Sequence, residues 1–233
     1  TPPQGVAIVA DPDRHVWRDQ KWMLEREKVQ ERPMMIYEMH VGSWQWHKDE
    51  HRPLGYRELA PKLVEYCKLM NFTFVELLPI TEHPLNESWG YQVTGFYAPT
   101  QRYGSLEDFQ YFVDYLHNAN IGVILDWVPG HFPTDSFALS SFDGEPLYEC
   151  VRNPSPLHPH WNTYTFDFFS KEVENFLLGS ALFWCDKMHI DGLRVDAVAS
   201  MLYLDYGRSQ GEWVKNSLGG NENLEAIEFF KHL

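Results

Sequence analysis

The sequence predicts an α/β fold, specifically the N-terminal half of a (β/α)8 barrel with about four βα units. Apolar runs of strand length alternate with helix-length amphipathic segments, and this order favours a parallel sheet with helical crossovers. The runs are almost continuously apolar, which is typical of strands buried on both faces. Polar residues gather where these runs end, as in a barrel, and no Gly-rich phosphate-binding loop follows any of them.

Four strands and four helices are expected, each from its local pattern. Leu59, Leu63, Tyr66 and Met70 recur at nearly helical period, and the run that follows them is β-branched and aromatic. The expected strands are 34–41, 72–80, 121–126 and 190–198, and the expected helices are 56–70, 106–120, 172–188 and 223–230. Residues 81–105 and 132–169 lack periodicity and are expected to be long loops, a kind of segment that is usually functional or disordered.

The domain organisation follows from the same reading. Residues 1–32 begin Pro-rich, end charged, and are expected to be a linker or the end of a preceding domain. Residues 33–233 form the partial barrel, with 132–169 as a long loop after its third strand. Thr1 is not an initiator Met, and the chain stops inside the fourth expected helix, so we expect a piece of a longer protein. Half a barrel has two open sheet edges, which predicts poor solubility for the piece alone.

Composition excludes several classes of partner. The chain has 233 residues, and 44% of them are hydrophobic, which predicts a globular protein. Its formal charge of −14 repels a polyanion such as nucleic acid. No run approaches the roughly 18 apolar residues of a membrane span. Three scattered cysteines do not resemble a disulfide framework, which favours a reducing compartment. The oligomeric state is left open.

A charged pair in the fourth expected strand is the first candidate for chemistry. If 190–198 is a strand, Arg194 and Asp196 point to one face, while Leu193, Val195 and Ala197 point to the other. Two explanations of this charged pair are equally good. It is either a structural ion pair or a functional pair, in which the guanidinium keeps Asp196 ionised as a nucleophile. Asp126 and His131 follow the neighbouring strand. Together these four residues predict a pocket that recognises a polyol.

Several motifs then resemble the α-amylase family of glycoside hydrolases and transglycosidases, and within it the 1,4-α-glucan branching enzymes. The likeness covers nearly everything from Pro33 to the end of the chain. The motifs are Tyr37-Glu38-Met39-His40-Val41-Gly42-Ser43-Trp44, Glu76-Leu77-Leu78-Pro79-Ile80, Trp89-Gly90-Tyr91-Gln92, Asp126-Trp127-Val128-Pro129-Gly130-His131-Phe132, Arg194-Val195-Asp196-Ala197-Val198-Ala199-Ser200-Met201 and Asn223-Leu224-Glu225-Ala226-Ile227.

The resemblance implies a retaining mechanism with a covalent glycosyl intermediate. Asp196 matches the nucleophile, and Arg194 matches the arginine that ionises and orients it. Asp126 and His131 match residues that grip glucose hydroxyls. Tyr91 matches an aromatic platform under the sugar, and its motif implies Trp89 and Gln92 as further substrate-binding residues.

Two departures limit what the resemblance carries over. Gly130 stands where many amylases have an Asn that binds calcium, and His158-Pro159-His160 lacks a third ligand at a suitable spacing, so neither a metal nor a cofactor is expected. The family's acid/base Glu and second transition-state Asp lie after later strands, beyond residue 233. We therefore expect the piece alone to be inactive.

The function implied for the longer protein is a cytoplasmic branching enzyme. It would cut an α-1,4-glucan and transfer the segment to a 6-hydroxyl. Two alternatives stay open: a hydrolase of the same family, amylase-like or trehalose-releasing, and a non-catalytic glucan-binding relative.

Overall fold

The computed structural model describes residues 8–31, 33–152 and 155–233. Within them the chain folds into two compact units. The first contains the described residues up to Glu82, together with Phe96–Trp127 and Leu182–Arg194. The second contains His83–Gly95, the described residues of Val128–Ala181, and Val195–Leu233.

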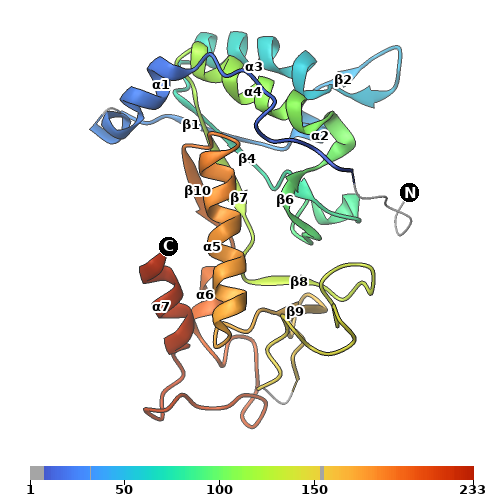
Figure 1. Ribbon diagram of the computed structural model, residues 1–233, viewed down its shortest axis with the longest axis vertical. Helices are drawn as coiled ribbons and strands as arrows, with labels where there is room; N and C mark the ends of the chain where they lie inside the picture. Colours follow the sequence, from blue (N-terminus) through green and yellow to red (C-terminus); the bar gives the residue numbers. More distant parts are fainter. Residues whose placement is uncertain (1–7, 32, 153–154) are drawn as a thin grey trace. The chain divides into compact units, whose positions relative to one another are not determined.

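The first unit is built on a four-stranded sheet (Figure 1). Its strand order is β1 (Ile36–Met39), β4 (Phe74–Leu77), β7 (Gly122–Trp127) and β10 (Gly192–Val195). β1 pairs with β4, and β4 with β7, in parallel. The strands succeed one another in the sheet in the order of the chain, as successive strands of a barrel do. The α/β fold with a parallel sheet is therefore confirmed.

The central strands pack as their apolar sequences predict. Val75 and Leu77 of β4 and Val123 and Leu125 of β7 are fully buried, as expected for strands covered on both faces. Gly122 allows a close approach, because a Cβ at this position would lie 2.2 Å from the Phe74 ring. A larger residue here would force the Phe74 ring to move.

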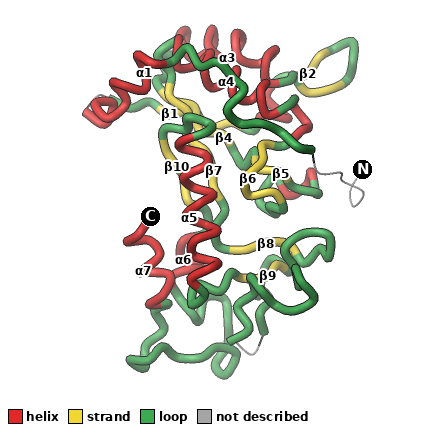
Figure 2. Tube along the Cα trace, viewed as in Figure 1, coloured by secondary structure: helices red, strands yellow, loops and turns green. Residues whose placement is uncertain are grey.

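Two capped helices accompany this sheet. α3 (Tyr56–Met70) and α4 (Leu106–Asn118) lie side by side, and α4 contacts β7 (Figure 2). The Glu58 carboxylate accepts the Gly55 N–H at the start of α3, and Ser105 forms a reciprocal capping box with Asp108 at the start of α4. Both predicted helices are confirmed within two residues. Of its periodic apolar residues, Leu59 and Leu63 are fully buried, whereas Met70 at the end of the helix is 47% exposed.

Part of the segment expected as a linker packs on the first unit. It contains α1 (Gln20–Glu25) and the 3-10 helix η1 (Arg26–Glu31). Trp22 is buried, stacks on His117 and donates Nε1–H to Asp191 at 2.8 Å. The division at residue 32 stays a prediction, and Thr1–Ala7 lie outside the described residues.

The second unit contains a short two-stranded sheet within the segment predicted to be a long loop. β8 (His131–Pro133) and β9 (Thr163–Thr165) pair in antiparallel fashion, with Phe132 opposite Tyr164. Glu149 lies between the two strands in the sequence and is buried. Its carboxylate accepts hydrogen bonds from the N–H groups of Ser141 and Tyr148. The long loop predicted over 132–169 thus contains two short paired strands that the sequence pattern did not indicate. This pairing and the Glu149 carboxylate satisfy part of its backbone.

The remaining elements are short apart from two helices. α5 (Lys171–Asp186) and α7 (Leu224–His232) confirm the third and fourth expected helices within two residues. The expected loop at 81–105 also contains paired strands, β5 and β6. The short elements are α2 (Val41–Trp44), β2 (Trp46–His47), β3 (Arg52–Pro53), β5 (Thr81–Glu82), η2 (Asn86–Ser88), β6 (Gly95–Pro99), η3 (Gln101–Tyr103) and α6 (Val198–Leu202).

The fourth strand ends earlier than predicted. β10 stops at Val195, Ala197 takes a left-handed conformation with φ 55°, and α6 begins at Val198. A residue in that conformation cannot continue an extended strand. The prediction of a strand to Val198 is wrong, so the alternation of faces does not extend to Asp196.

No helix among the described residues has both the length and the apolar character needed to cross a membrane.

Candidate functional site

In the first unit, Asp126 and Arg194 form an ion pair between neighbouring strands. Arg194 Nη1 donates to Oδ1 of Asp126 at 2.9 Å and to Oδ2 at 3.0 Å. The Asp126 side chain is 3% exposed, and that of Arg194 is 44% exposed. A buried carboxylate needs such a partner to stay ionised. The guanidinium that the sequence pairs with Asp196 thus bonds to Asp126.

Two further carboxylates share this face of the sheet. Glu38 and Glu76 are directly opposite each other in the β1–β4 register, and Asp126 lies two residues beyond Ile124, the partner of Glu76. Burial, Glu38 and Asp126 raise the pKa of Glu76 above its ordinary value, and Arg194 counteracts part of this rise. Arg194 is therefore the cation that balances a group of three acidic side chains.

In the second unit, residues from separate segments line one open hollow of about 370 Å³. Four of them are predicted site residues: Tyr91, Gln92, His131 and Asp196. Tyr91 and Gln92 follow η2, His131 begins β8, and Asp196 lies between β10 and α6. The hollow therefore combines a carboxylate, an imidazole, an amide and a phenol ring. This set of donors, acceptors and one flat ring suits a sugar.

His131 is held in its neutral form. Its ring is buried, and its Nδ1 has no hydrogen-bond partner among the described residues. Burial lowers the pKa of His131 to about 4. At neutral pH the ring therefore offers one donor and one acceptor, which suits a hydroxyl group better than a charged ligand.

Sequence reasoning missed two lining residues, Ser88 and Trp161. The Trp161 ring lies 4.9 Å from that of His131 and stacks on His158 at 3.7 Å with an interplanar angle of 2°. The signal for Trp161 was its place in an aperiodic, aromatic-rich segment. No local pattern distinguishes it from the other aromatic residues there.

Trp89 does not line the hollow. It is 58% exposed and has a left-handed backbone, with φ 54°.

Glu82, another polar residue at a strand end, accepts hydrogen bonds from Thr100 Oγ1, the Gln101 N–H and Arg102 Nη1. Its role in the first unit is thus structural.

The described residues contain no group of three His, Cys, Asp or Glu side chains placed to hold a metal ion. Gly130 stands where many amylases have a calcium-binding Asn, and close packing against Met201 explains why a glycine is found there. A Cβ at this position would lie 3.1 Å from Met201 Cγ. The expectation that no metal is required stays a prediction.

Comparison with known proteins agrees with this geometry. The model of the α-amylase catalytic domain matches residues 59–144. The 1,4-alpha-glucan branching enzyme GlgB of Chlamydia caviae is 71% identical over 231 residues, which are 99% of this chain. This chain is thus similar along almost its whole length to a branching enzyme, and over residues 59–144 to the α-amylase catalytic domain.

Other branching enzymes are similar to this chain to nearly the same degree. The enzymes of the same name from Chlamydia abortus and Chlamydia trachomatis serovar L2 are 70% and 68% identical, over 100% and 99% of this chain. The chain spans 32% of the length of the Chlamydia caviae relative. A crystal structure of a putative α-amylase from Salmonella typhimurium superposes with a TM-score of 0.66 and 26% identity, covering 82% of this chain and 30% of that one.

Proposed function

We propose that the intact protein is a 1,4-α-glucan branching enzyme, which cleaves an α-1,4-glucan and transfers the freed segment to a 6-hydroxyl. The observation that carries this proposal is the hollow in the second unit, where Tyr91, Gln92, His131 and Asp196 meet from three segments of the chain. The names of the relatives, at 68–71% identity, supply the reaction.

Asp196 is the nucleophile of this proposal. Its carboxylate attacks the anomeric carbon while the acid/base Glu that the resemblance places beyond residue 233 protonates the leaving oxygen. The glycosidic bond breaks and a covalent glycosyl intermediate forms, and the same Glu later takes the proton of the acceptor hydroxyl. The incoming 6-hydroxyl then displaces Asp196, so the anomeric configuration is retained. Arg194, two residues earlier, is the group that the family resemblance assigns to keeping Asp196 ionised. In the first unit its guanidinium bonds to Asp126.

The other residues bind the sugar. Neutral His131 and Asp126 hold hydroxyl groups, since hydrogen bonds that tighten in the transition state lower the barrier. Gln92 adds an amide donor and acceptor, and the Tyr91 ring supplies an apolar face. Trp89, exposed beside them in sequence, contacts a glucan unit outside the hollow.

The proposal places the protein in the cytoplasm with an α-glucan as its partner. It requires neither a metal nor a cofactor, so a chelator should leave the turnover of the intact protein unchanged.

Incubation of the intact protein with amylose tests the reaction. We expect new α-1,6 linkages, detected by NMR or by debranching, without a rise in reducing ends. Rising reducing ends without branches would instead identify a hydrolase.

Replacing the nucleophile, Asp196→Asn, should lower turnover roughly 1,000-fold or more. The matched control is Asp186→Asn, whose side chain is 75% exposed, and it should keep full activity. Unchanged turnover of the Asp196→Asn variant would contradict the mechanism.

A further inference from the structure

The second unit contains another cavity, of about 300 Å³. It shares a wall with the hollow, because Trp161 lines the hollow while His158, stacked face to face on Trp161, lines the cavity. In the same way, Gly130 lines the cavity, and His131, the next residue in the chain, lines the hollow. None of the predicted site residues lines this cavity.

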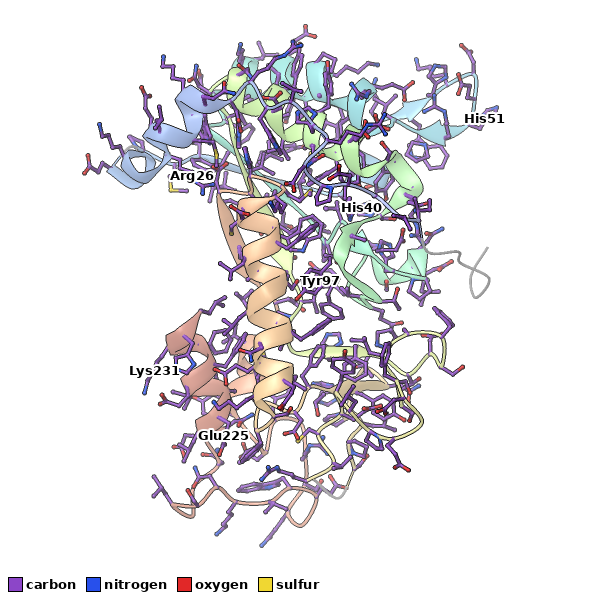
Figure 3. All side chains as sticks on the ribbon, viewed as in Figure 1. Arg26, His40, His51, Tyr97, Glu225 and Lys231 are labelled. Atoms are coloured by element: carbon purple, nitrogen blue, oxygen red, sulfur yellow. The ribbon has the colours of Figure 1, made fainter. Side chains whose placement is uncertain are left out.

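The charge of the cavity is opposite to that of the chain. Three cationic residues line it, Arg152, Arg208 and Lys215, and the lining contains one carboxylate, that of Glu225. Glu225 lies at the start of α7 (Figure 3). Arg152 lies 4.0 Å from the Asp167 carboxylate, so Arg208 and Lys215 are the cations that matter here. The chain as a whole has a formal charge of −14. Arg208 Nη2 donates to the Leu157 carbonyl at 2.9 Å. Cations gathered in a concave site favour an anionic ligand.

A buried donor lies in the wall. His158 is 4% exposed, and its Nδ1 accepts the His160 N–H at 3.3 Å. Burial, with the nearby His131, His160 and Arg208, lowers the pKa of His158 to about 4, so the ring is neutral at pH 7. The proton then resides on Nε2, which has no hydrogen-bond partner among the described residues. A ligand oxygen accepting from Nε2 would remove the cost of leaving this donor buried and unpaired.

Aromatic rings complete the lining. Tyr206 lies 6.0 Å from the His158 ring, and the rings of Tyr203 and Phe169 also line the cavity. Flat rings suit the apolar face of a sugar. The volume is at the small end of ligand pockets, about 300 to 1,000 Å³, and accommodates one sugar ring with one substituent group.

From the cations, the buried Nε2–H and these rings, we propose that the cavity binds a phosphorylated monosaccharide. The phosphate lies against Arg208 and Lys215, and the sugar lies against the aromatic rings. His158 donates to a ligand oxygen. The ligand thereby fixes the ring on which Trp161 stacks, next to the proposed catalytic hollow. The assignment does not depend on the proposed function.

Calorimetric titration of the intact protein tests this proposal, with glucose 6-phosphate, glucose and inorganic phosphate as probes. We expect glucose 6-phosphate to bind at least tenfold more tightly than either of the others. Arg208→Gln should weaken it at least tenfold, and Lys215→Gln, at an exposed position, should weaken it several-fold without disturbing the fold. Arg14→Gln, on an exposed side chain of the first unit, is the matched control and should change nothing.

Two variants distinguish the cavity from the hollow. His158→Phe keeps a ring to stack on Trp161 but removes the donor, and it should weaken glucose 6-phosphate several-fold. Asp196→Asn should leave this binding intact, whatever it does to turnover. The proposal is overturned if the intact protein does not bind glucose 6-phosphate, if glucose or phosphate alone binds as tightly, if Arg208→Gln has no effect, or if Asp196→Asn abolishes binding.

Discussion

Trp161 is the residue that connects the two lined spaces of the second unit. One part of its ring lines the hollow with Asp196, and its face stacks on the buried His158. A large aromatic ring held in place by a second ring loses little conformational freedom when a sugar contacts it, which makes it an efficient binding group. Its position, rather than its sequence context, gives it this role.

Removal of that ring should weaken glucan binding in the intact protein. We expect Trp161→Ala to raise KM for amylose about tenfold, whereas Trp161→Phe should retain most of the affinity because a flat ring remains. Steady-state kinetics measure both variants. Trp46→Ala, which removes an exposed indole of the first unit, should leave KM unchanged. An unaltered KM for Trp161→Ala would exclude the ring from sugar binding.

At the level of elements, a buried histidine joins three parts of the first unit. His117 of α4 bonds through Nδ1 to Asp19, before α1, at 2.8 Å and through Nε2 to Asp191, before β10, at 2.9 Å. Asp19 also bonds to His189 Nδ1 at 2.8 Å. Both ring nitrogens face carboxylates, so the imidazolium fits this arrangement better than either neutral tautomer. Burial lowers the pKa of His117, but the bonds to Asp19 and Asp191 outweigh it and raise the pKa above its ordinary value.

This network predicts a pH dependence of stability. Because the folded pKa of His117 is raised, its contribution is complete below the ordinary histidine pKa of about 6.5 and is lost as pH rises through the raised value. Asp19, whose pKa is depressed, contributes above the ordinary aspartate pKa and loses its contribution as pH falls. We expect His117→Gln to cost about 3 kcal/mol at pH 6 and clearly less at pH 9.

Urea unfolding of wild type and His117→Gln at the two pH values measures this difference. His131 and His158 have lowered pKa values and act in the opposite direction, so only the difference between the two proteins isolates His117. An equal cost at pH 6 and pH 9 would show that the ring is neutral in the fold.

At the scale of the whole molecule, β1 lies at the end of the four-stranded sheet. Ile36 on this strand is 43% exposed, and Met34 and Met35 before it are 45% and 49% exposed. An apolar edge strand with free backbone groups is a template for pairing with another chain. The 233-residue chain expressed alone should therefore self-associate.

A charge on this edge should reduce that association. We expect Ile36→Lys to shift the 233-residue chain toward monomer in analytical ultracentrifugation, with unchanged far-UV circular dichroism. Leu182→Lys, at a residue 67% exposed on α5, is the control for added charge alone. Equal association of all three proteins would point to a surface other than β1.

The sequence by itself determined the four βα units and the kinds of residue at their ends. Helical periodicity placed α3, α4, α5 and α7 within a few residues, because the apolar face of each helix is a local property of its sequence. Motif likeness predicted Asp196, Arg194, Asp126 and His131 as site residues. The paired strands at 81–105 and 132–169 escaped it, since their pairing satisfies the backbone without an apolar pattern.

Tertiary structure alone decided which side chains meet. It showed that the strand ends at Val195, that Arg194 bonds to Asp126, and that Trp161 rather than Trp89 lines the hollow. It also placed Arg208, Lys215 and the buried His158 around one cavity. These are contacts between segments far apart in the chain. Burial and partners, which set both hydrogen bonding and pKa, exist only after those segments have packed together.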